Sequence, residues 1–212
     1  CHEQGIKTVP VTAGYVTDIA RQPVFECFDA ANVDLKAFSD GFYKKLCTAE
    51  LGAVLDSLEF LVHETDVWIE ITTLLIPGEN DSDEEIHGAS RWVADRLGAD
   101  VPWHFTAFHP DYRMLDKPGT PAATLTRARA IAKSYGLRYV YTGNVHDEHG
   151  GSTRCHDCGE TLVGRDWYEL TGWGLAEAGR CRRCGTSCPG VFEARPGSWG
   201  ARRQPVRLSD FA

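Results

Sequence analysis

The chain has 212 residues, of which 42% are hydrophobic and 25% are charged, a composition typical of a globular protein of one or two domains. No apolar run reaches the roughly 18 residues that a membrane span needs, and no signal peptide is evident, so we expect a cytoplasmic protein with no membrane partner. The net charge of −8 is uneven. Residues 1–150 hold 13 Lys and Arg against 23 Asp and Glu, and residues 151–212 hold 9 Arg against 7 acidic residues, which disfavours nucleic acid as a partner.

The chain begins with Cys1, and its one methionine is Met114. Residues 1–5 (CHEQG) are typical of the last turn of a helix that Gly5 closes, and a β-rich run over 6–12 follows at once. A helix that ends at its fifth residue has lost its beginning. We therefore expect that upstream structure is missing from this sequence.

Strand and helix signals alternate through the first 145 residues. Short β-branched or aromatic runs that stop at turn residues predict strands at 9–12, 32–38, 67–76, 103–109 and 138–142. Among the helical segments between them, Ser82 and Glu85 form a capping-box pattern, and Thr120 is predicted to cap a helix with Pro121 at its first position. Five strands with four intervening helical segments indicate parallel βα units, in either an open doubly wound sheet or a (β/α) barrel.

The pattern changes near Gly150, where helical periodicity ends and cysteine pairs appear. Cys155 and Cys158 form one Cys-x-x-Cys-Gly knuckle, and Cys181 and Cys184 form a second one. Two such turns can aim four thiolates at one ion, the closed tetrahedral set that structural Zn²⁺ prefers. The sequence does not distinguish zinc from iron in such a four-cysteine site. The knuckles predict a small module that metal binding allows to fold.

Polar residues also stand where the predicted strands end. Alternation places Asp34 and Lys36 on one side of their strand, where a solvated ion pair is the plain interpretation. His109 ends another strand and by itself is typical of a packed histidine. The turn Ile76-Pro77-Gly78 is by itself only a loop. In parallel βα folds, however, the chemistry gathers at these carboxyl ends.

Several segments together resemble a known family, the radical S-adenosylmethionine (SAM) proteins related to pyruvate formate-lyase activating enzyme. They are VTAGY (11–15), VDLKAF (33–38), TTLLIPGEND (72–81) and FTAFHP (105–110). The chain is most similar to the branch called AmmeMemoRadiSam system radical SAM proteins. In that branch a segment like YTGNVHD (141–147) leads into a ribbon that ends as residues 181–192 do. Ala13 stands where Asn is common in the family, and Cys188 replaces an apolar residue.

The resemblance implies an α/β fold with a partial (β/α) barrel of parallel strands over 1–147. A small β-rich zinc ribbon over 150–192 and an extended tail over 193–212 would follow. It also implies that Lys36 and His109 lie beside bound SAM. The residues expected to shape the same pocket are Thr12, Asp34, Ile76, Pro77 and Gly78.

In the full-length enzymes a [4Fe–4S] cluster reductively cleaves SAM to a 5′-deoxyadenosyl radical, which abstracts hydrogen. The cluster is held by three cysteines spaced C-x₃-C-x₂-C, and this sequence has no such triplet. Cys181, Cys184 and Cys188 run in the reverse order. We therefore expect the cluster to be bound upstream of Cys1, and this piece alone not to cleave SAM. The substrate stays open, with a partner protein as one candidate.

Two other functions fit parts of the sequence. The first is a zinc-ribbon interaction module on a βα scaffold, which would bind protein or nucleic acid without catalysis. The second is a metal-dependent hydrolase that uses His104, His109, His146 and Asp147, although no HxH or HExxH pair supports it.

Overall fold

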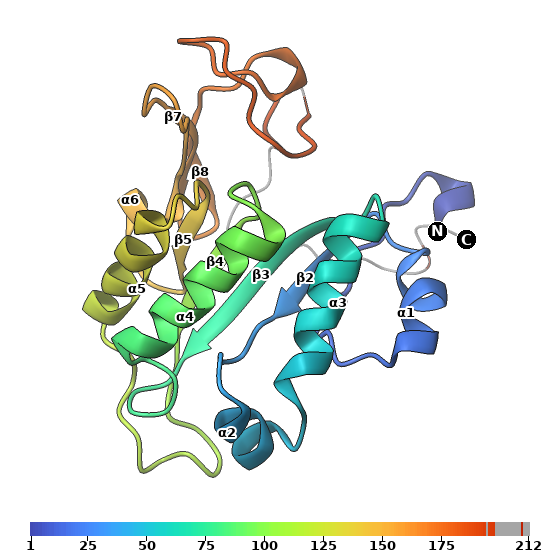
Figure 1. Cartoon of the computed structure of the whole chain (residues 1–212). Coiled ribbons are helices and arrows are strands. Elements are labelled where there is room, and N and C mark those ends of the chain that lie inside the picture. Colours follow the sequence, from blue (N-terminus) through green and yellow to red (C-terminus); the bar gives the residue numbers. More distant parts are fainter. Residues whose placement is uncertain (194, 198–208, 210–212) are drawn as a thin grey trace. The chain divides into compact units, whose positions relative to one another are not determined.

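The computed structural model describes residues 1–193, 195–197 and 209, so the predicted tail at 193–212 lies mostly outside the described residues. The chain divides into two compact units, Cys1–Gly150 and Gly151–Ala212. The first unit alternates strands and helices (Figure 1). Its elements are a 3₁₀ turn (His2–Gln4), β1 (Val11–Thr12), α1 (Asp18–Phe25), β2 (Ala30–Asp34), α2 (Asp40–Phe42), a π-helical turn (Tyr43–Cys47), α3 (Leu51–Glu64), β3 (Trp68–Leu75), α4 (Asp83–Trp92), a second π-helical turn (Val93–Leu97), β4 (Trp103–Ala107), α5 (Ala122–Ser134), β5 (Val140–Gly143) and α6 (Glu148–Gly151).

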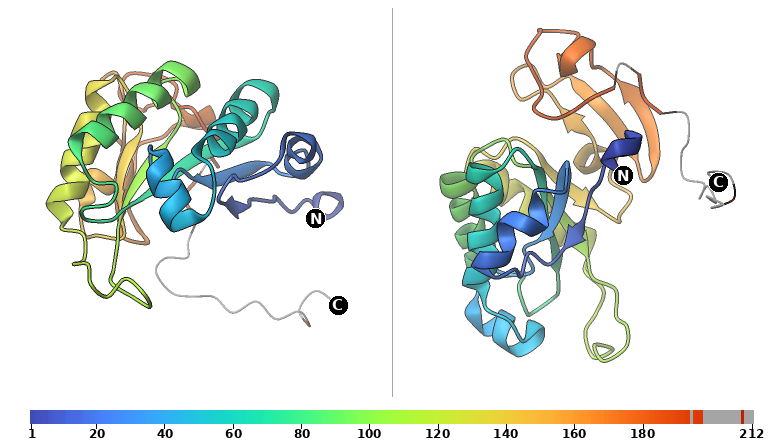
Figure 2. Two further views of the ribbon diagram at one scale, coloured as in Figure 1. Left: turned by 60° about the horizontal axis from the view of Figure 1, so that its bottom comes forward. Right: turned by 90° about the vertical axis from the view of Figure 1, so that its right-hand side faces the viewer.

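The five strands of the first unit form one parallel sheet in the order β1-β2-β3-β4-β5. Helices α1, α3, α4 and α5 all cover the same face of that sheet (Figure 2). A doubly wound sheet would reverse its strand order and carry helices on both faces. The sequential order and one-sided cover are those of a partial (β/α) barrel, which confirms the predicted fold class.

The core of this unit lies between the sheet and its helices. On β3 the alternate residues Ile69, Ile71, Thr73 and Leu75 are buried, and they face that core. Trp103 and Phe105 of β4 do the same, with ring centroids 4.6 Å apart. The partly exposed residues between them point to the helix-free face, as the period of two requires.

Three local predictions were wrong in detail. The second strand was expected to reach Phe38, but the β2 ladder ends at Asp34. Thr120 does not cap α5, because its Oγ1 donates to the Leu75 carbonyl and accepts from the Phe108 amide. The capping box at α4 is only half formed.

In that box the Ser82 hydroxyl accepts from the Glu85 amide as predicted. The Glu85 carboxylate, however, accepts from the amide of Phe38 and not from that of Ser82. A side chain predicted to act within its own helix thus holds a segment 47 residues away.

In the described part of the second unit, β6 (Thr153–Arg154), β7 (Thr161–Asp166) and β8 (Glu169–Trp173) form a three-stranded antiparallel sheet, which a 3₁₀ turn (Glu177–Gly179) follows. Its described apolar core is small and includes Leu162, Val163 and Leu175. This confirms the prediction of a small β-rich module. In the described part of the chain, no helix is both long and apolar enough to cross a membrane.

Candidate functional site

The helix-free face of the parallel sheet carries a row of polar side chains. In register across four neighbouring strands lie Asp34 of β2, Thr72 of β3, His104 of β4 and Tyr141 of β5. All four are partly exposed, in contrast to the buried residues between them. Such a row forms the inner wall of a complete (β/α) barrel, where ligands bind at the carboxyl ends of the strands.

Asp34 and Lys36 lie at the carboxyl end of β2 on this face, as alternation predicts. The Lys36 ammonium is 2.9 Å from the Asp34 carboxylate, and both side chains are about one-third exposed (39% and 33%). Because the pair is accessible, the ammonium has donors left for a further anionic group.

Sequence reasoning missed the most complete polar cluster on the face. His104 Nε2 lies 2.7 Å from a Glu70 carboxylate oxygen, and the imidazole stacks on the Tyr141 ring at 4.9 Å between centroids. Glu70 also accepts from the Trp68 indole at 3.4 Å. The available signal was an acidic residue inside the β-branched run VWIEITT. In the sequence alone, His104 suggests only a metal ligand.

The turn after β3 holds the next predicted site residues. Ile76 is buried, Pro77 is half-buried, and Gly78 is exposed with φ of 74°, which glycine adopts without strain. The Gly78 amide donates to Asp81 at 2.7 Å. This turn therefore has one well-defined conformation at the carboxyl edge of the sheet.

Glu79 ties the same turn to two other segments. Its carboxylate is 2.6 Å from the Lys117 ammonium and 3.3 Å from that of Lys45. The hydrogen bond from Lys117, followed by that from Lys45, holds the pKa of Glu79 below its ordinary value. The loop after β4 and the π-helical turn after α2 are thereby anchored next to Ile76–Gly78.

The other two predicted SAM contacts differ in placement. His109 follows β4 by two residues, at the same carboxyl edge, and its side chain is exposed. Thr12 is in register with Val33, so it points to the helix side and not to the face of Asp34 and Lys36. Its hydroxyl accepts from the Gly14 amide at 3.2 Å. The structure thus gathers Asp34, Lys36, the Ile76–Gly78 turn and His109 at one edge, and leaves Thr12 facing the other way.

The residues of the hydrolase hypothesis do not assemble. Asp147 accepts from the Thr142 hydroxyl and the Gly150 amide within its own turn. His104 is engaged by Glu70. Among the described residues, the one group of three or more His, Cys, Asp or Glu side chains close enough to share a metal lies elsewhere, in the second unit.

That group is the four predicted cysteines. The ligand atoms of Cys155, Cys158, Cys181 and Cys184 all lie within 4.8 Å of one another. The sulfurs of Cys155 and Cys184 are 3.6 Å apart, and those of Cys158 and Cys181 are 3.7 Å apart. Tetrahedral Zn–S bonds of about 2.3 Å require sulfurs about 3.8 Å apart. The four thiols therefore fit a single tetrahedral ion.

The two knuckles have matching backbone geometry. Gly159 and Gly185 have φ of 74° and 80°, and their amides donate to the carbonyls of Cys155 and Cys181 at 3.0 and 2.9 Å. Contacts with the Thr186 side chain and backbone lower the pKa of Cys184 to about 7, which favours a thiolate. Cys188 follows Cys184 by four residues and is buried, but it does not belong to the four-sulfur group.

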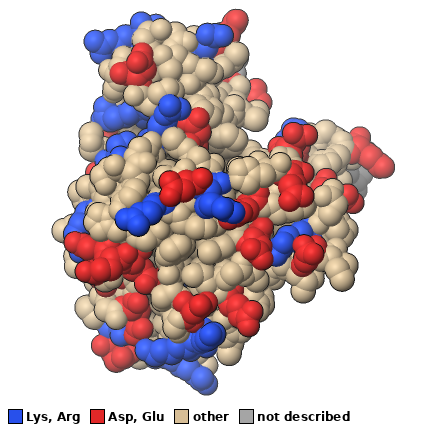
Figure 3. All heavy atoms as spheres, viewed as in Figure 1, with Lys and Arg blue, Asp and Glu red and all other residues tan. Residues whose placement is uncertain are grey.

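Charge is dispersed over the helix-covered face (Figure 3). Acidic and basic side chains alternate there without a broad basic surface, in agreement with the acidic balance of residues 1–150. This face gives no support to nucleic-acid binding.

No protein-family model matches the chain. An uncharacterized protein of Methanocaldococcus jannaschii is 40% identical over 185 residues, which cover 86% of this chain and 54% of the relative. The chain thus spans about half the length of that curated relative.

Two solved structures share the fold. A domain of pyruvate-formate lyase-activating enzyme from Bacteroides vulgatus matches with a TM-score of 0.59 and 18% identity, over 68% of this chain and 85% of that one. A radical SAM methyltransferase from Sphaerobacter thermophilus matches with a TM-score of 0.52 and 18% identity, over 72% of this chain and 43% of that one. At such identities the likeness concerns architecture, and this chain has the fold of domains from radical SAM enzymes.

Proposed function

We propose that this chain is the C-terminal part of a radical SAM enzyme, related to the AmmeMemoRadiSam branch. Its role there is to supply one wall of the SAM and substrate pocket and a structural zinc site. The observation that carries the proposal is the row of polar side chains on the helix-free face of the sheet, with Asp34, Lys36, the Ile76–Gly78 turn and His109 at its carboxyl edge. Residues 1–147 are assigned to the barrel and residues 150–192 to the ribbon.

Lys36 is the residue best suited to hold SAM. Its ammonium is accessible and is paired with Asp34, so it can bind the carboxylate of the SAM methionine group while Asp34 keeps it oriented. The exposed His109 imidazole can donate to or accept from the same ligand. Ile76 shapes the turn, and the carbonyls of Pro77 and Gly78 can accept from the adenine, because the Ile76 and Gly78 amides already donate to Asn80 and Asp81. Thr12 contributes to this pocket only by shaping the backbone of β1.

The exposed edge at β1 is a second argument that this chain is part of a larger barrel. Val9 just before β1, Val11 in β1 and Ile19 in α1 are 59%, 77% and 91% exposed, so apolar side chains stand open beside a sheet edge. Such an edge is suited to pairing with further βα units. We propose that the cluster-bearing half of the enzyme joins there.

The residues of this chain do not fit a [4Fe–4S] cluster of the radical SAM type, because the C-x₃-C-x₂-C triplet is missing. No catalytic step is therefore assigned to residues of this chain. The four-cysteine centre does fit Zn²⁺, which with four thiolates has no open position and stabilises its module. The substrate is unassigned, with a glycyl residue of a partner protein as one candidate, and the proposed location is the cytoplasm.

SAM binding to a longer protein that also carries the upstream half of the barrel tests the proposal. Isothermal titration with SAM should give one saturable site, and Lys36→Ala should weaken it roughly tenfold to hundredfold, as expected for the loss of a charge-assisted hydrogen bond. His109→Ala should weaken binding as well, and neither change should remove the bound metal. The matched control is Lys7→Ala, which breaks a similar ion pair with Asp29 (2.7 Å) just before the amino end of β2. Equal SAM affinity in wild type, Lys36→Ala and His109→Ala would defeat the site assignment.

A further inference from the structure

Asn80 is a fully buried polar side chain between two segments of the proposed pocket. It is 2% exposed, and its amide group uses every hydrogen that it can donate. Nδ2 donates to the carbonyls of Lys36 at 2.7 Å and Leu74 at 2.8 Å, and Oδ1 accepts from the Ile76 amide at 2.6 Å. The opposite amide orientation would place two N–H groups against each other, so this network fixes the side chain uniquely.

The backbone that Asn80 holds has left the sheet. After the β2 ladder ends at Asp34, side chains replace strand partners for the next residues. The Leu35 carbonyl accepts from Thr73 Oγ1 at 2.6 Å, and the Lys36 amide donates to Tyr43 Oη at 3.1 Å.

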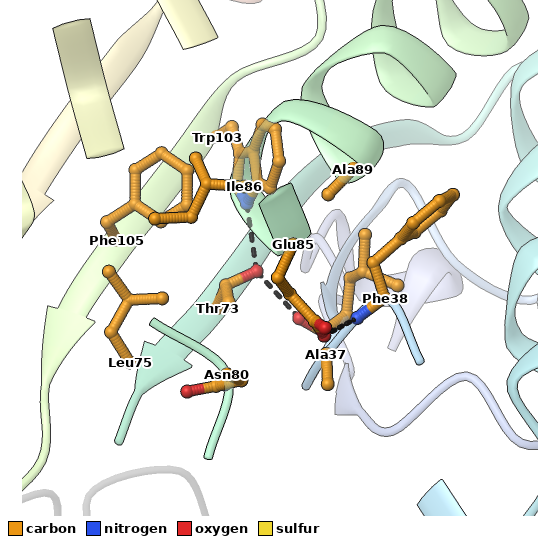
Figure 4. Close-up of a pocket in the computed structure, with 11 residues that line it drawn as sticks. Ala37, Phe38, Thr73, Leu75, Asn80, Glu85, Ile86, Ala89, Trp103 and Phe105 are labelled. Carbon is orange, nitrogen blue, oxygen red and sulfur yellow. Dashed lines mark hydrogen bonds between the residues drawn. The ribbon is translucent and has the colours of Figure 1, made fainter. Parts of the chain in front are cut away.

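Side chains also bond to the backbone of the residues that follow Lys36. The Phe38 amide donates to Glu85 at 2.5 Å, and Trp103 Nε1 donates to Thr73 at 2.9 Å (Figure 4). Figure 4 shows Thr73 of β3 and Glu85 of α4 reaching this segment, with Asn80 of the turn after β3 near them. The backbone of Lys36 is thus held rigidly while its ammonium stays accessible.

Asn80 differs from the other three side chains in what it joins. The two pocket elements are the segment after β2 and the turn after β3. Thr73, Tyr43 and Glu85 bond only to the first of these elements. Asn80 bonds to both, at the Lys36 carbonyl and at the Ile76 amide. These are the two elements that the SAM pocket requires at a fixed separation. Preorganised contacts bind more tightly because less motion is lost on binding.

We propose that Asn80 is a positioning residue for SAM: it fixes Lys36 and the Ile76–Gly78 turn relative to each other without touching the ligand. The inference rests on the proposed SAM pocket. Replacing Asn80 by Ser removes both donated bonds, and the expected SAM affinity falls roughly tenfold or more.

The test is calorimetric titration of SAM into the longer protein with the upstream half, carrying Asn80→Ser or Asn80→Asp. The control is Ser57→Ala, which removes one buried hydrogen bond inside α3, from Ser57 Oγ to the Ala53 carbonyl at 2.9 Å, outside both elements. The control should change SAM affinity less than twofold. Such a result separates loss of positioning from a general loss of stability.

Asn80→Asp adds a readout that a merely structural role would not give. A protonated carboxyl keeps one donor and one acceptor, whereas an ionised one has no donor. The SAM affinity of this variant relative to wild type should therefore recover as the pH falls from 8 to 5.5, and that of Asn80→Ser should not. The titratable groups around the turn, Lys36, Glu79, Asp81 and Glu85, are present in both proteins, so the ratio isolates residue 80.

The outcomes separate the two proposals. If wild type binds SAM and Asn80→Ser binds it within twofold of wild type, the positioning role is refuted and the pocket stands. If wild type does not bind SAM, the pocket is refuted and the role of Asn80 with it. Should Asn80→Ser fail to fold, the reversible pH response of Asn80→Asp decides, and a flat ratio would overturn the inference.

Discussion

Removing one sulfur from the four-cysteine centre should unfold the second unit and leave the first intact. The perturbation is Cys158→Ser. In the wild-type chain the Cys158 sulfur lies 3.7 Å from that of Cys181, in a group of four sulfurs that matches tetrahedral geometry. Structural zinc contributes about 10–16 kcal/mol to small zinc-finger domains. The described aliphatic core here is Leu162, Val163 and Leu175, at about 1.5–3 kcal/mol for each buried side chain. Metal binding therefore stabilises this unit more than its aliphatic core does, and the core cannot offset the loss of the ion.

Two measurements follow this change. Elemental analysis should give one metal ion per wild-type chain and none for Cys158→Ser. Hydrogen exchange should show that the Cys155 and Cys181 amides, bonded at 2.8 Å to Glu160 and Thr186, lose protection in the variant. Amides of β2 to β4 should keep theirs. The control is Cys188→Ser, a buried thiol outside the four-sulfur group, which should retain the metal. A fully metallated Cys158→Ser protein, or metal loss on changing Cys188, would refute the ligand set.

Two further predictions concern the first unit. Thr73→Val leaves the Leu35 carbonyl and the Trp103 indole N–H buried without partners, so it should lower the free energy of unfolding by about 2–4 kcal/mol in urea titrations. The control, Thr72→Val on the helix-free face, should lower it by less than about 1 kcal/mol. Equal effects of the two substitutions would contradict the assigned network. Burial raises the pKa of Tyr43 to about 12, so between pH 10 and 12 the unfolded chain releases a proton that the folded chain retains, and stability falls as the pH rises. Wild type should lose about 2–3 kcal/mol more than Tyr43→Phe over that window, and parallel stability curves would rule out a buried neutral phenol.

The features that could be predicted from the sequence are those that depend on local geometry. The Cys-x-x-Cys-Gly turns are each complete within five residues, and alternation alone places Asp34 and Lys36 on one side of their strand, without knowledge of a partner strand. The parallel βα arrangement follows from the same periodicity. The choice between barrel and doubly wound sheet does not, because it depends on which face the helices cover.

The errors share one physical cause. Thr120 and Glu85 match local capping patterns, yet both bond to segments that the fold brings from far along the chain. The Glu70–His104 contact joins residues 34 apart, and it exists only because β3 and β4 pair in one particular register. Thr12 turns to the helix side for the same reason, since its direction is fixed by pairing with Val33. Polar residues that hold a tertiary structure together have no local signature.

The most direct test of the whole account is metal and SAM analysis of this chain beside a longer protein that carries upstream sequence, both purified without oxygen. The account predicts about one zinc in each, with about four further irons and reductive SAM cleavage only in the longer protein. Zinc in both and iron in neither would contradict it, and would leave a βα scaffold whose ribbon serves to bind a partner.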